Sequence, residues 1–325
     1  MIGKIASIVA ALCAAASFGE LHNPQVYWRM CDASAAISLD HEHFVAADDE
    51  GNTLLVYKRG TPDSVRSYDL AKFLLTKKKA ESDLEGAARV GDRIYWISSH
   101  GRDRKGKAAP DRQRFFATKV YGSPGLTLDP IGKPYRGLLR DLLAEQRFAR
   151  FGFAAASLLA PKDKGGLNIE GLTARPDGTL LIAFRNPVPA GKALLVPLLN
   201  PDKVIEGARA QFGDVIELNL DGSGVRDLTL VGDKYLVIAG ARDGTRKFGL
   251  FLWNGRDGNP QKLAGNHFEK LNPEAIFRFQ NDAPNIFQIL SDDGSRKFAG
   301  KECKDYPVGE RNFRAGELLL ELPQP

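Results

Sequence analysis

A short motif recurs at the start of successive hydrophobic strands in this chain. Each copy has a small polar residue, an apolar residue and then a third residue, which is Glu in three copies. The copies are Asp32-Ala33-Ser34, Asp83-Leu84-Glu85-Gly86, Asn168-Ile169-Glu170-Gly171, Asn272-Pro273-Glu274-Ala275 and a degenerate Gly224-Val225-Arg226. Repeats of this kind usually mean that one supersecondary unit is used several times. We therefore expect a repeat architecture and look for the unit around each copy.

A second short hydrophobic run follows each copy after a turn. These runs are rich in β-branched and aromatic residues and are bounded by Gly, Asp or Asn, which is typical of antiparallel hairpins. The second runs are His43 to Ala47, Arg93 to Ile97, Thr179 to Phe184, Lys234 to Ile238 and Asn285 to Leu290. Third and fourth strands are expected to follow, including 193–198 and 214–220 in the third unit and 248–253 in the fourth. The unit is thus predicted to be a four-stranded antiparallel sheet.

The spacing of the motif predicts an all-β, five-bladed β-propeller. Three intervals between copies, and the stretch from the last copy to residue 325, are each about fifty residues, which suits a four-stranded propeller blade. The longer interval holds residues 136–160, whose leucines and phenylalanine recur at helical spacing. We interpret this stretch as a helical insertion in the second unit, and six blades remain an alternative if it hides a degenerate one. The propeller is expected to form a single domain over residues 20–325.

The N-terminus is typical of an export signal. A basic start is followed by an apolar run and by small residues, so we expect residues 1–19 to be a signal peptide. The mature protein is then periplasmic or extracellular and does not span a membrane. Of the three cysteines, Cys13 leaves with the signal, and Cys31 and Cys303 remain near the two ends. Two cysteines in an oxidising compartment are expected to pair, although two free buried thiols are the alternative.

The formal net charge of +5 is mildly basic. Lysine and arginine runs such as 77–79 and 102–107 lack the aromatic interleaving of a nucleic-acid site, and we interpret them as solvated loops. A monomer that binds a small anionic ligand, and no nucleic acid, is the expectation.

Antiparallel pairing puts the start of each first strand beside the end of each second strand. The third motif residues should therefore converge at one face of the disc as a ring of Ser34, Glu85, Glu170, Arg226 and Glu274. Three carboxylates in a narrow channel repel one another and need a cation, a proton or a hydrogen-bonding lattice. Ca²⁺ with oxygen ligands is one solution, and Arg226 bridging the carboxylates without a metal is another. A purely structural ring is the third.

The stretches 31–34, 83–86 and especially 164–172 resemble the bacterial family of domain of unknown function 3616, which is similar to the esterase-like phytase group of propellers. A more distant resemblance is to the calcium-activated apyrases, five-bladed propellers whose central calcium is held by serine and glutamate residues. That resemblance implies Ca²⁺ as cofactor, with Ser34, Glu85, Glu170 and Glu274 as its ligands. Arg226 departs from the pattern, because a cation stands where a neutral ligand is expected.

Two functions follow. The first is a Ca²⁺-dependent hydrolase of phosphate or other anionic esters, with Glu170 and His100 as candidate catalytic residues. Its anionic substrate would be held by Lys164, Arg185, Asn186, Arg226 and Arg242. No Gly-x-Ser-x-Gly motif is present, which disfavours a serine esterase. The second is a non-enzymatic propeller that binds a ligand or a protein and whose polar ring is structural.

Overall fold

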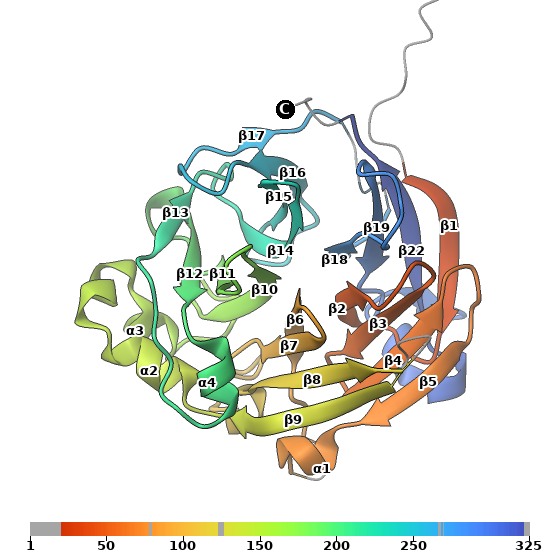
Figure 1. Ribbon diagram of the computed structural model, residues 1–325, viewed down its shortest axis with the longest axis horizontal. Coiled ribbons are helices and arrows are strands. Elements are labelled where there is room, and N and C mark those ends of the chain that lie inside the picture. The colour runs from red at the N-terminus through yellow and green to blue at the C-terminus, as the bar shows by residue number, and fades with distance from the viewer. Residues whose placement is uncertain (1–20, 78–79, 123–126, 266–267, 269, 322–325) are drawn as a thin grey trace, which may run out of the picture.

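The computed structural model describes residues 21–77, 80–122, 127–265, 268 and 270–321. Five four-stranded sheets are arranged radially around a central axis, as the blades of a propeller (Figure 1). Within each of these sheets, neighbouring strands are paired antiparallel. The prediction of five blades is thereby confirmed, and the additional sequence of the second unit does not form a sixth.

Four blades follow the chain from the innermost strand outward. The first two are β2 (Ala33–Ser38), β3 (His43–Asp48), β4 (Thr53–Lys58) and β5 (Ser64–Asp69), then β6 (Leu84–Val90), β7 (Arg93–Ser98), β8 (Phe115–Tyr121) and β9 (Thr127–Tyr135). The next two are β10 (Asn168–Ala174), β11 (Leu180–Asn186), β12 (Ala193–Leu198) and β13 (Ile216–Leu218), then β14 (Gly224–Val231), β15 (Lys234–Gly240), β16 (Phe248–Trp253) and β17 (Gln261–Lys262).

The fifth blade is built from both ends of the described chain. Its inner strands are β18 (Pro273–Phe277) and β19 (Ile286–Ser291), followed by β22 (Asn312–Leu319) and, outermost, β1 (Leu21–Trp28). Strand β1 runs antiparallel to β22 along the rim (Figure 1). This pairing closes the ring and was not predicted from the sequence.

Tight turns join the first two strands of the blades. In the second and fourth blades the loops are Gly91-Asp92 and Gly232-Asp233, and both glycines have a φ of 61°. A two-residue hairpin with Gly at its first position is the turn whose twist matches paired strands. The same turns, each between two apolar runs, were the basis on which the opening hairpins were predicted.

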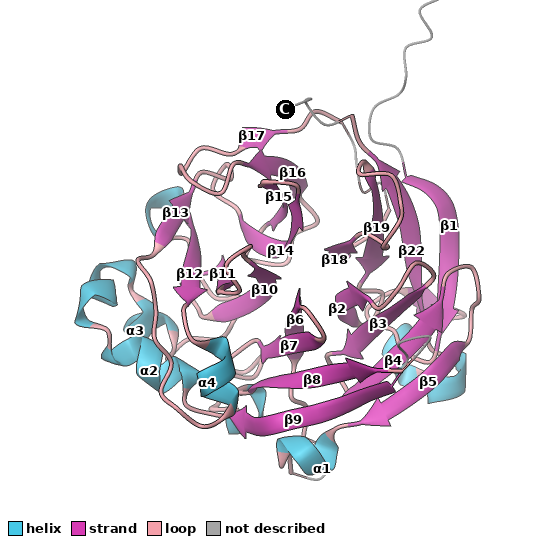
Figure 2. Cartoon of the chain, viewed as in Figure 1, coloured by secondary structure: helices cyan, strands magenta, loops and turns pink. Residues whose placement is uncertain are grey.

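Helices lie at the periphery of the second and third blades (Figure 2). The predicted insertion at 136–160 contains α2 (Leu138–Ala144), the 3₁₀ turn Gln146–Phe151 and α3 (Phe153–Ala156). The remaining elements are α1 (Ala71–Leu74), α4 (Pro201–Ile205), the hairpin of β20 (Lys297–Phe298) and β21 (Lys301–Glu302), and 3₁₀ turns at Pro110–Arg112, Pro189–Gly191, Cys303–Asp305 and Val308–Glu310.

The hydrophobic core is divided among the blade interfaces. Within the described residues, buried apolar side chains form five clusters, each of which joins neighbouring blades. The cluster between the second and third blades also takes in Phe148, Phe151 and Phe153 of the insertion. Because the apolar side chains pack between sheets, the polar third motif residues are left to the centre of the ring.

Candidate functional site

Each innermost strand carries a β-bulge at its third motif residue. In every blade the register between the first and second strands skips one position, and the five positions are Ser34, Glu85, Glu170, Arg226 and Glu274. A bulge takes one side chain out of the normal alternation and re-aims it. The repeated motif is thus the sequence of a repeated bulge, which brings residues from all five blades to the central channel.

Arginine and glutamate side chains form a chain of ion pairs on one side of this channel. Nη1 of Arg226 lies 3.1 Å from Oε2 of Glu170, and Nη2 of the same arginine contacts Oε1 of Glu274. Arg185, at the end of β11, contacts the same Glu170. All four side chains are less than 10% exposed. Two of the three ring carboxylates are therefore neutralised by guanidinium groups.

Two glycines make room for Arg226. A Cβ at Gly240, at the end of the neighbouring strand, would lie 2.7 Å from Cγ of Arg226, and one at Gly224 would collide with the carbonyl of Arg185. Both positions therefore require the absence of a side chain if the two arginines are to reach the channel together.

Carboxyl groups gather elsewhere in the channel, where Glu85 of β6 lies close to the residue that follows β3 and to the residue that precedes β6. Asp49, Asp83 and Glu85 each offer a carboxylate oxygen, and these oxygens lie within 4.8 Å of one another. Asp32, Asp48 and Asp49 form a second such group, so that Asp49 belongs to both. In the described part of the chain, these are the groupings of acidic, histidine and cysteine side chains close enough to share an ion.

The environment favours the protonated form of these acids. Burial and the neighbouring Asp292 raise the pKa of Asp32 to about 9, and burial raises the pKa of Asp48 to about 6. Burial, followed by the charge of Asp32, holds the pKa of Asp49 well above its usual range. Burial, followed by Asp83, does the same to the pKa of Glu85. A cation bound among them would displace protons and relieve this repulsion.

The two sides meet in a cavity of about 260 Å³ at the centre of the disc. Its lining includes the acids Asp49, Asp83, Glu85 and Asp292, the ring members Glu170 and Glu274, and the cations Arg104, Arg112, Lys162 and Arg185. Arg112 donates from Nη1 to Asp83 Oδ2 at 3.0 Å and from Nη2 to Glu81 at 2.7 Å. The cavity thus presents oxygen ligands and guanidinium groups side by side.

Ca²⁺ fits the donor set of Asp49, Asp83 and Glu85. Among the residues that the structure describes, Oδ1 of Asp49 is buried without a hydrogen-bond partner, and Glu85 makes no hydrogen bond or ion pair. Carboxylate oxygens completed by water are ligands that Ca²⁺ accepts in flexible geometry. The four ligands expected from the sequence do not meet in this way, since Glu170 and Glu274 contact Arg226. Ser34 Oγ is also engaged, because it donates to the carbonyl of Leu84 and ties the first blade to the second.

His100 lies in an apolar pocket beside the helical insertion and does not line the channel cavity. Its neighbours there include Leu138, Leu142 and Phe184. Nδ1 is 2.8 Å from the carbonyl of Ser98, and Nε2 is buried without a partner among the described residues. Burial lowers the pKa of His100 to about 4. The histidine is therefore neutral and out of contact with the cavity.

Three further predicted residues occupy different places. Asn186 is buried, and its Nδ2 donates to the carbonyls of Pro161 and Asp163 at 3.0 and 2.8 Å, which holds the cavity-lining loop. Lys164 is exposed in the same loop, and Arg242 is partly buried after β15. The described lining of the cavity includes neither Lys164 nor Arg242.

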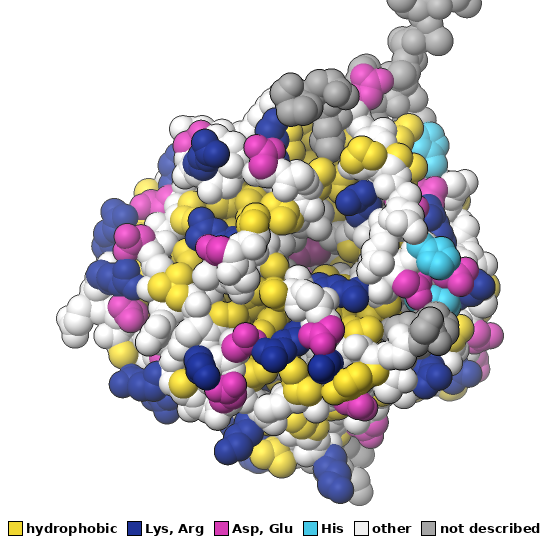
Figure 3. All heavy atoms as spheres, viewed as in Figure 1, with side chains coloured by type: hydrophobic (Ala, Val, Ile, Leu, Met, Phe, Trp, Pro, Cys, Tyr) yellow, Lys and Arg dark blue, Asp and Glu magenta, His cyan; other side chains and the backbone are white. Residues whose placement is uncertain are grey.

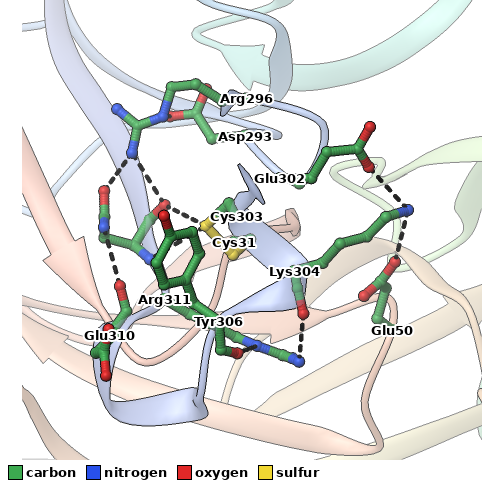
Figure 4. The surroundings of a disulfide bond; sticks show 12 residues. Cys31, Glu50, Asp293, Arg296, Glu302, Cys303, Lys304, Tyr306, Glu310 and Arg311 are labelled. Atoms are coloured by element: carbon green, nitrogen blue, oxygen red, sulfur yellow. Dashed lines mark hydrogen bonds and ion pairs between the residues drawn. A yellow bond between two sulfur atoms is a disulfide. The ribbon is translucent and has the colours of Figure 1, made fainter. Parts of the chain in front are cut away.

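The predicted disulfide between Cys31 and Cys303 is confirmed. It joins the residue before Asp32 to the segment after β21, and Lys304 extends from that segment toward Glu50 and Glu302 (Figure 4). The Lys304 Nζ to Glu50 Oε1 distance is 3.4 Å. The bridge therefore anchors the segment that carries Lys304.

Residues 133–264 match the model of a family described as a protein of unknown function (DUF3616). The predicted resemblance to the family of domain of unknown function 3616 is confirmed over these residues. Among the curated proteins, none matches the chain.

Solved structures with low similarity include several propellers. The β-propeller domain of Myceliophteria thermophila Cps50 (Swd1) is 9% identical with a TM-score of 0.41, and the match covers 93% of this chain and 100% of that one. YCF48 bound to D1 peptide is 12% identical with a TM-score of 0.36, and the match covers 88% of this chain and 63% of that one. Kuenenia stuttgartiensis hydrazine synthase is 10% identical with a TM-score of 0.38, and the match covers 82% of this chain and 57% of that one. The chain therefore spans less than two thirds of the length of these last two proteins.

The N-terminal signal peptide expected at residues 1–19 lies outside the described residues. Within the described residues, no helix has the length and hydrophobicity needed to cross a membrane. On the face turned to the viewer in Figure 3, basic and acidic side chains are interspersed and do not form a patch of one sign.

Several residues of the cavity were not assigned to it from the sequence. Asp83 opens one of the motif copies, and Asp49 and Asp292 follow second strands, so all three stand at positions that the repeated motif marks in the sequence. Arg104 belongs to the run 102–107 that was interpreted as a solvated loop, and Arg112 follows it in the same connection between β7 and β8. Only the folded path of that loop brings them to the channel.

Proposed function

We propose that this propeller is an exported, Ca²⁺-dependent hydrolase of phosphate or related anionic esters. The observation that carries the proposal is the convergence of Asp49, Asp83 and Glu85 within 4.8 Å of one another, in a cavity that also presents Arg112 and Arg185. Carboxylates suit the cation and guanidinium groups suit the anionic part of a substrate. The disulfide is in keeping with an oxidising compartment.

Each part of the site has a task in such a reaction. Asp49, Asp83 and Glu85 would hold the cation, which when bound polarises a substrate oxygen or a water molecule. Arg104, Arg112 and Lys162 line the same cavity and would hold the anionic oxygens. Glu170 and Glu274 hold the guanidinium group of Arg226 in one position at the channel, so that its charge is already in place when a substrate binds. Hydrolysis then forms one bond from water oxygen to the ester centre and breaks the bond to the alcohol, which leaves with the proton.

A propeller that only binds an anionic ligand is the second candidate. It is favoured by the ion pairs of Arg185 and Arg226 with Glu170, since this half of the ring is neutral without any ligand. In this case the cation and the anion would bind as proposed, but no ester bond would break.

Glu85→Gln tests the cation site. Wild type should melt at a higher temperature in Ca²⁺ than in EDTA, because ligand bound only to the folded state stabilises it. The variant should lose most of this shift, while its melting temperature in EDTA stays equal or rises, because the substitution removes a buried carboxyl group beside other acids. Glu321→Gln, an exposed change of the same kind, is the control.

Activity distinguishes the two candidates. Purified protein is assayed in Ca²⁺ against p-nitrophenyl phosphate, nucleotides and phytate. For a hydrolase, Glu85→Gln should lower turnover by about 10- to 100-fold or more, as loss of metal-site residues does. A Ca²⁺ shift without any turnover would favour the binding protein, and the absence of any Ca²⁺ shift in wild type would rule out both as stated.

A further inference from the structure

A second and larger cavity lies against the channel entrance. Its volume is about 800 Å³, and it is lined by the loop 103–112 and by Glu50, Lys77, Glu81 and Lys304. Arg104 and Arg112 line this cavity as well as the central one. The two spaces are therefore adjacent, and we name the outer one the vestibule.

The acidic side chains of the vestibule are already engaged. Glu81 binds Arg112, Glu50 binds Lys304, Asp111 binds Arg114, and Asp103 accepts backbone N–H groups. By contrast, four cations of the lining make no ion pair with the described residues: Lys77, Arg104, Lys105 and Lys107. The vestibule is therefore a basic space with available positive charge.

Hydrogen bonds fix the loop that carries three of these cations. Oδ1 of Asp103 accepts the N–H groups of Lys105 and Lys107, both at 2.8 Å. Arg102 donates from Nε to the carbonyl of Ser157 at 2.9 Å and from Nη1 to that of Gly106 at 3.0 Å, which ties the turn to the helical insertion. A binding loop held in this way loses little conformational entropy when a ligand arrives.

The size and charge of the vestibule indicate the class of ligand. A single phosphate group would occupy only the central cavity, whereas pockets of 300–1,000 Å³ are typical for whole small molecules. Building on the function proposed above, we propose that the substrate is a linear polyanion with two or more phosphate-like groups. One group lies at the central cavity, and the next is bound in the vestibule by Arg104, Lys105 and Lys107.

Inorganic tripolyphosphate and orthophosphate are the probes, and calorimetric titration in EDTA at fixed ionic strength is the measurement. EDTA removes any contribution from a metal, and a fixed salt concentration keeps electrostatic screening constant. We expect wild type to bind tripolyphosphate at least tenfold more tightly than orthophosphate. Lys105→Gln combined with Lys107→Gln should weaken tripolyphosphate binding by about tenfold, since each lysine supplies a charge-assisted contact.

The control is Lys133→Gln combined with Lys297→Gln, which removes the same net charge at exposed sites outside the vestibule. It should bind tripolyphosphate as wild type does. Equal weakening in both double variants, equal affinity for the two probes, or binding of polyglutamate in place of tripolyphosphate would overturn the proposal. If tripolyphosphate binds in EDTA but Ca²⁺ does not raise the melting temperature, the polyanion site in the vestibule is supported and the proposed function is refuted. If Ca²⁺ raises the melting temperature but tripolyphosphate does not bind, the cation site of the proposed function is supported and the polyanion site is refuted.

Discussion

Arg226 divides the central ring into two halves with different electrostatics. It bridges Glu170 and Glu274, and Arg185 adds a second cation to that side. The pKa of Glu85 is raised by burial and by Asp83 and Glu170, and the charges of Arg185 and Arg226 lower it in part. The same bulge in five strands therefore produces one side whose glutamates are paired with arginines and another side where Glu85 makes no ion pair with a described residue, and an added cation suits the second side.

His100 should make the protein sensitive to mild acid. Its pKa in the folded state is about 4, whereas an unfolded chain binds this proton near pH 6.5. The neutral imidazole of His100 therefore makes its full contribution to the free energy of unfolding above pH 6.5. This contribution, up to about 3 kcal/mol, is lost as the pH falls from 6.5 towards 4. His100→Phe should reduce this loss in urea unfolding measured at pH 7 and pH 4.5.

His41→Phe, at an exposed position, is the matched control and should leave the acid sensitivity as it is in wild type. An unchanged pH dependence in His100→Phe would show that another group is responsible. Because His100 does not line the channel cavity, the same variant should also keep wild-type binding of tripolyphosphate.

Strand β1 is the element that holds the ring closed. It pairs with β22 from Leu21↔Leu318 to Trp28↔Asn312, and a bulge between His22 and Gln25 interrupts the ladder. Its side chain Tyr27 is 3% exposed and packs against Phe44, Tyr57 and Phe313. One aromatic residue of the N-terminal strand therefore joins the first blade to the last.

Tyr27→Ala should destabilise the protein by about 3–5 kcal/mol, as large truncations in a packed aromatic core do. Tyr27→Phe should cost about 1 kcal/mol, because it removes only the hydroxyl that accepts the Gly60 N–H at 3.3 Å. Val26→Ala on the same strand, 40% exposed, is the control and should change stability by less than about 0.5 kcal/mol. Urea unfolding of the three variants measures these differences, and equal losses in Tyr27→Ala and Val26→Ala would show that β1 does not close the ring.

The elements differ in how well the sequence predicts them. Hairpins such as β6–β7 and β14–β15 were predicted because a Gly-Asp turn joins two apolar runs that are adjacent in the chain. Strand β1 was not predicted, because Pro24 and polar residues interrupt its run of apolar residues and because its partner β22 lies at the other end of the described chain. The bulges were missed for a related reason, since a skipped register position is visible only when both strands are paired.

At the scale of the whole molecule, two connections join the ends of the chain. One is the β1–β22 ladder, and the other is the disulfide between Cys31 and Cys303, which are 272 positions apart in the sequence. The disulfide could be predicted from its two cysteines and the expected export. The cavity could be predicted only in part, because Arg104 and Arg112 reach it through a loop whose path depends on the helical insertion.

Removal of the disulfide should lower the free energy of unfolding by about 2–5 kcal/mol, because a long closed loop restricts the unfolded chain. The paired change Cys31→Ala and Cys303→Ala is compared with wild type by urea unfolding, with and without reductant. Reductant should destabilise wild type and leave the variant unchanged. An equal effect of reductant on both proteins would contradict the assignment, as would a free thiol at Cys31 or Cys303 in unreduced protein by mass analysis.

Closure of the last blade by the first strand also bears on how the protein is made. Strand β1 is synthesised before the other four blades, yet its partner β22 begins only at Asn312, so the fifth blade stays incomplete until all four of them have been translated. A premature stop codon before that residue would not yield a propeller with one blade fewer. It would yield an open ring with two unpaired edges, and unpaired edges of this kind favour aggregation.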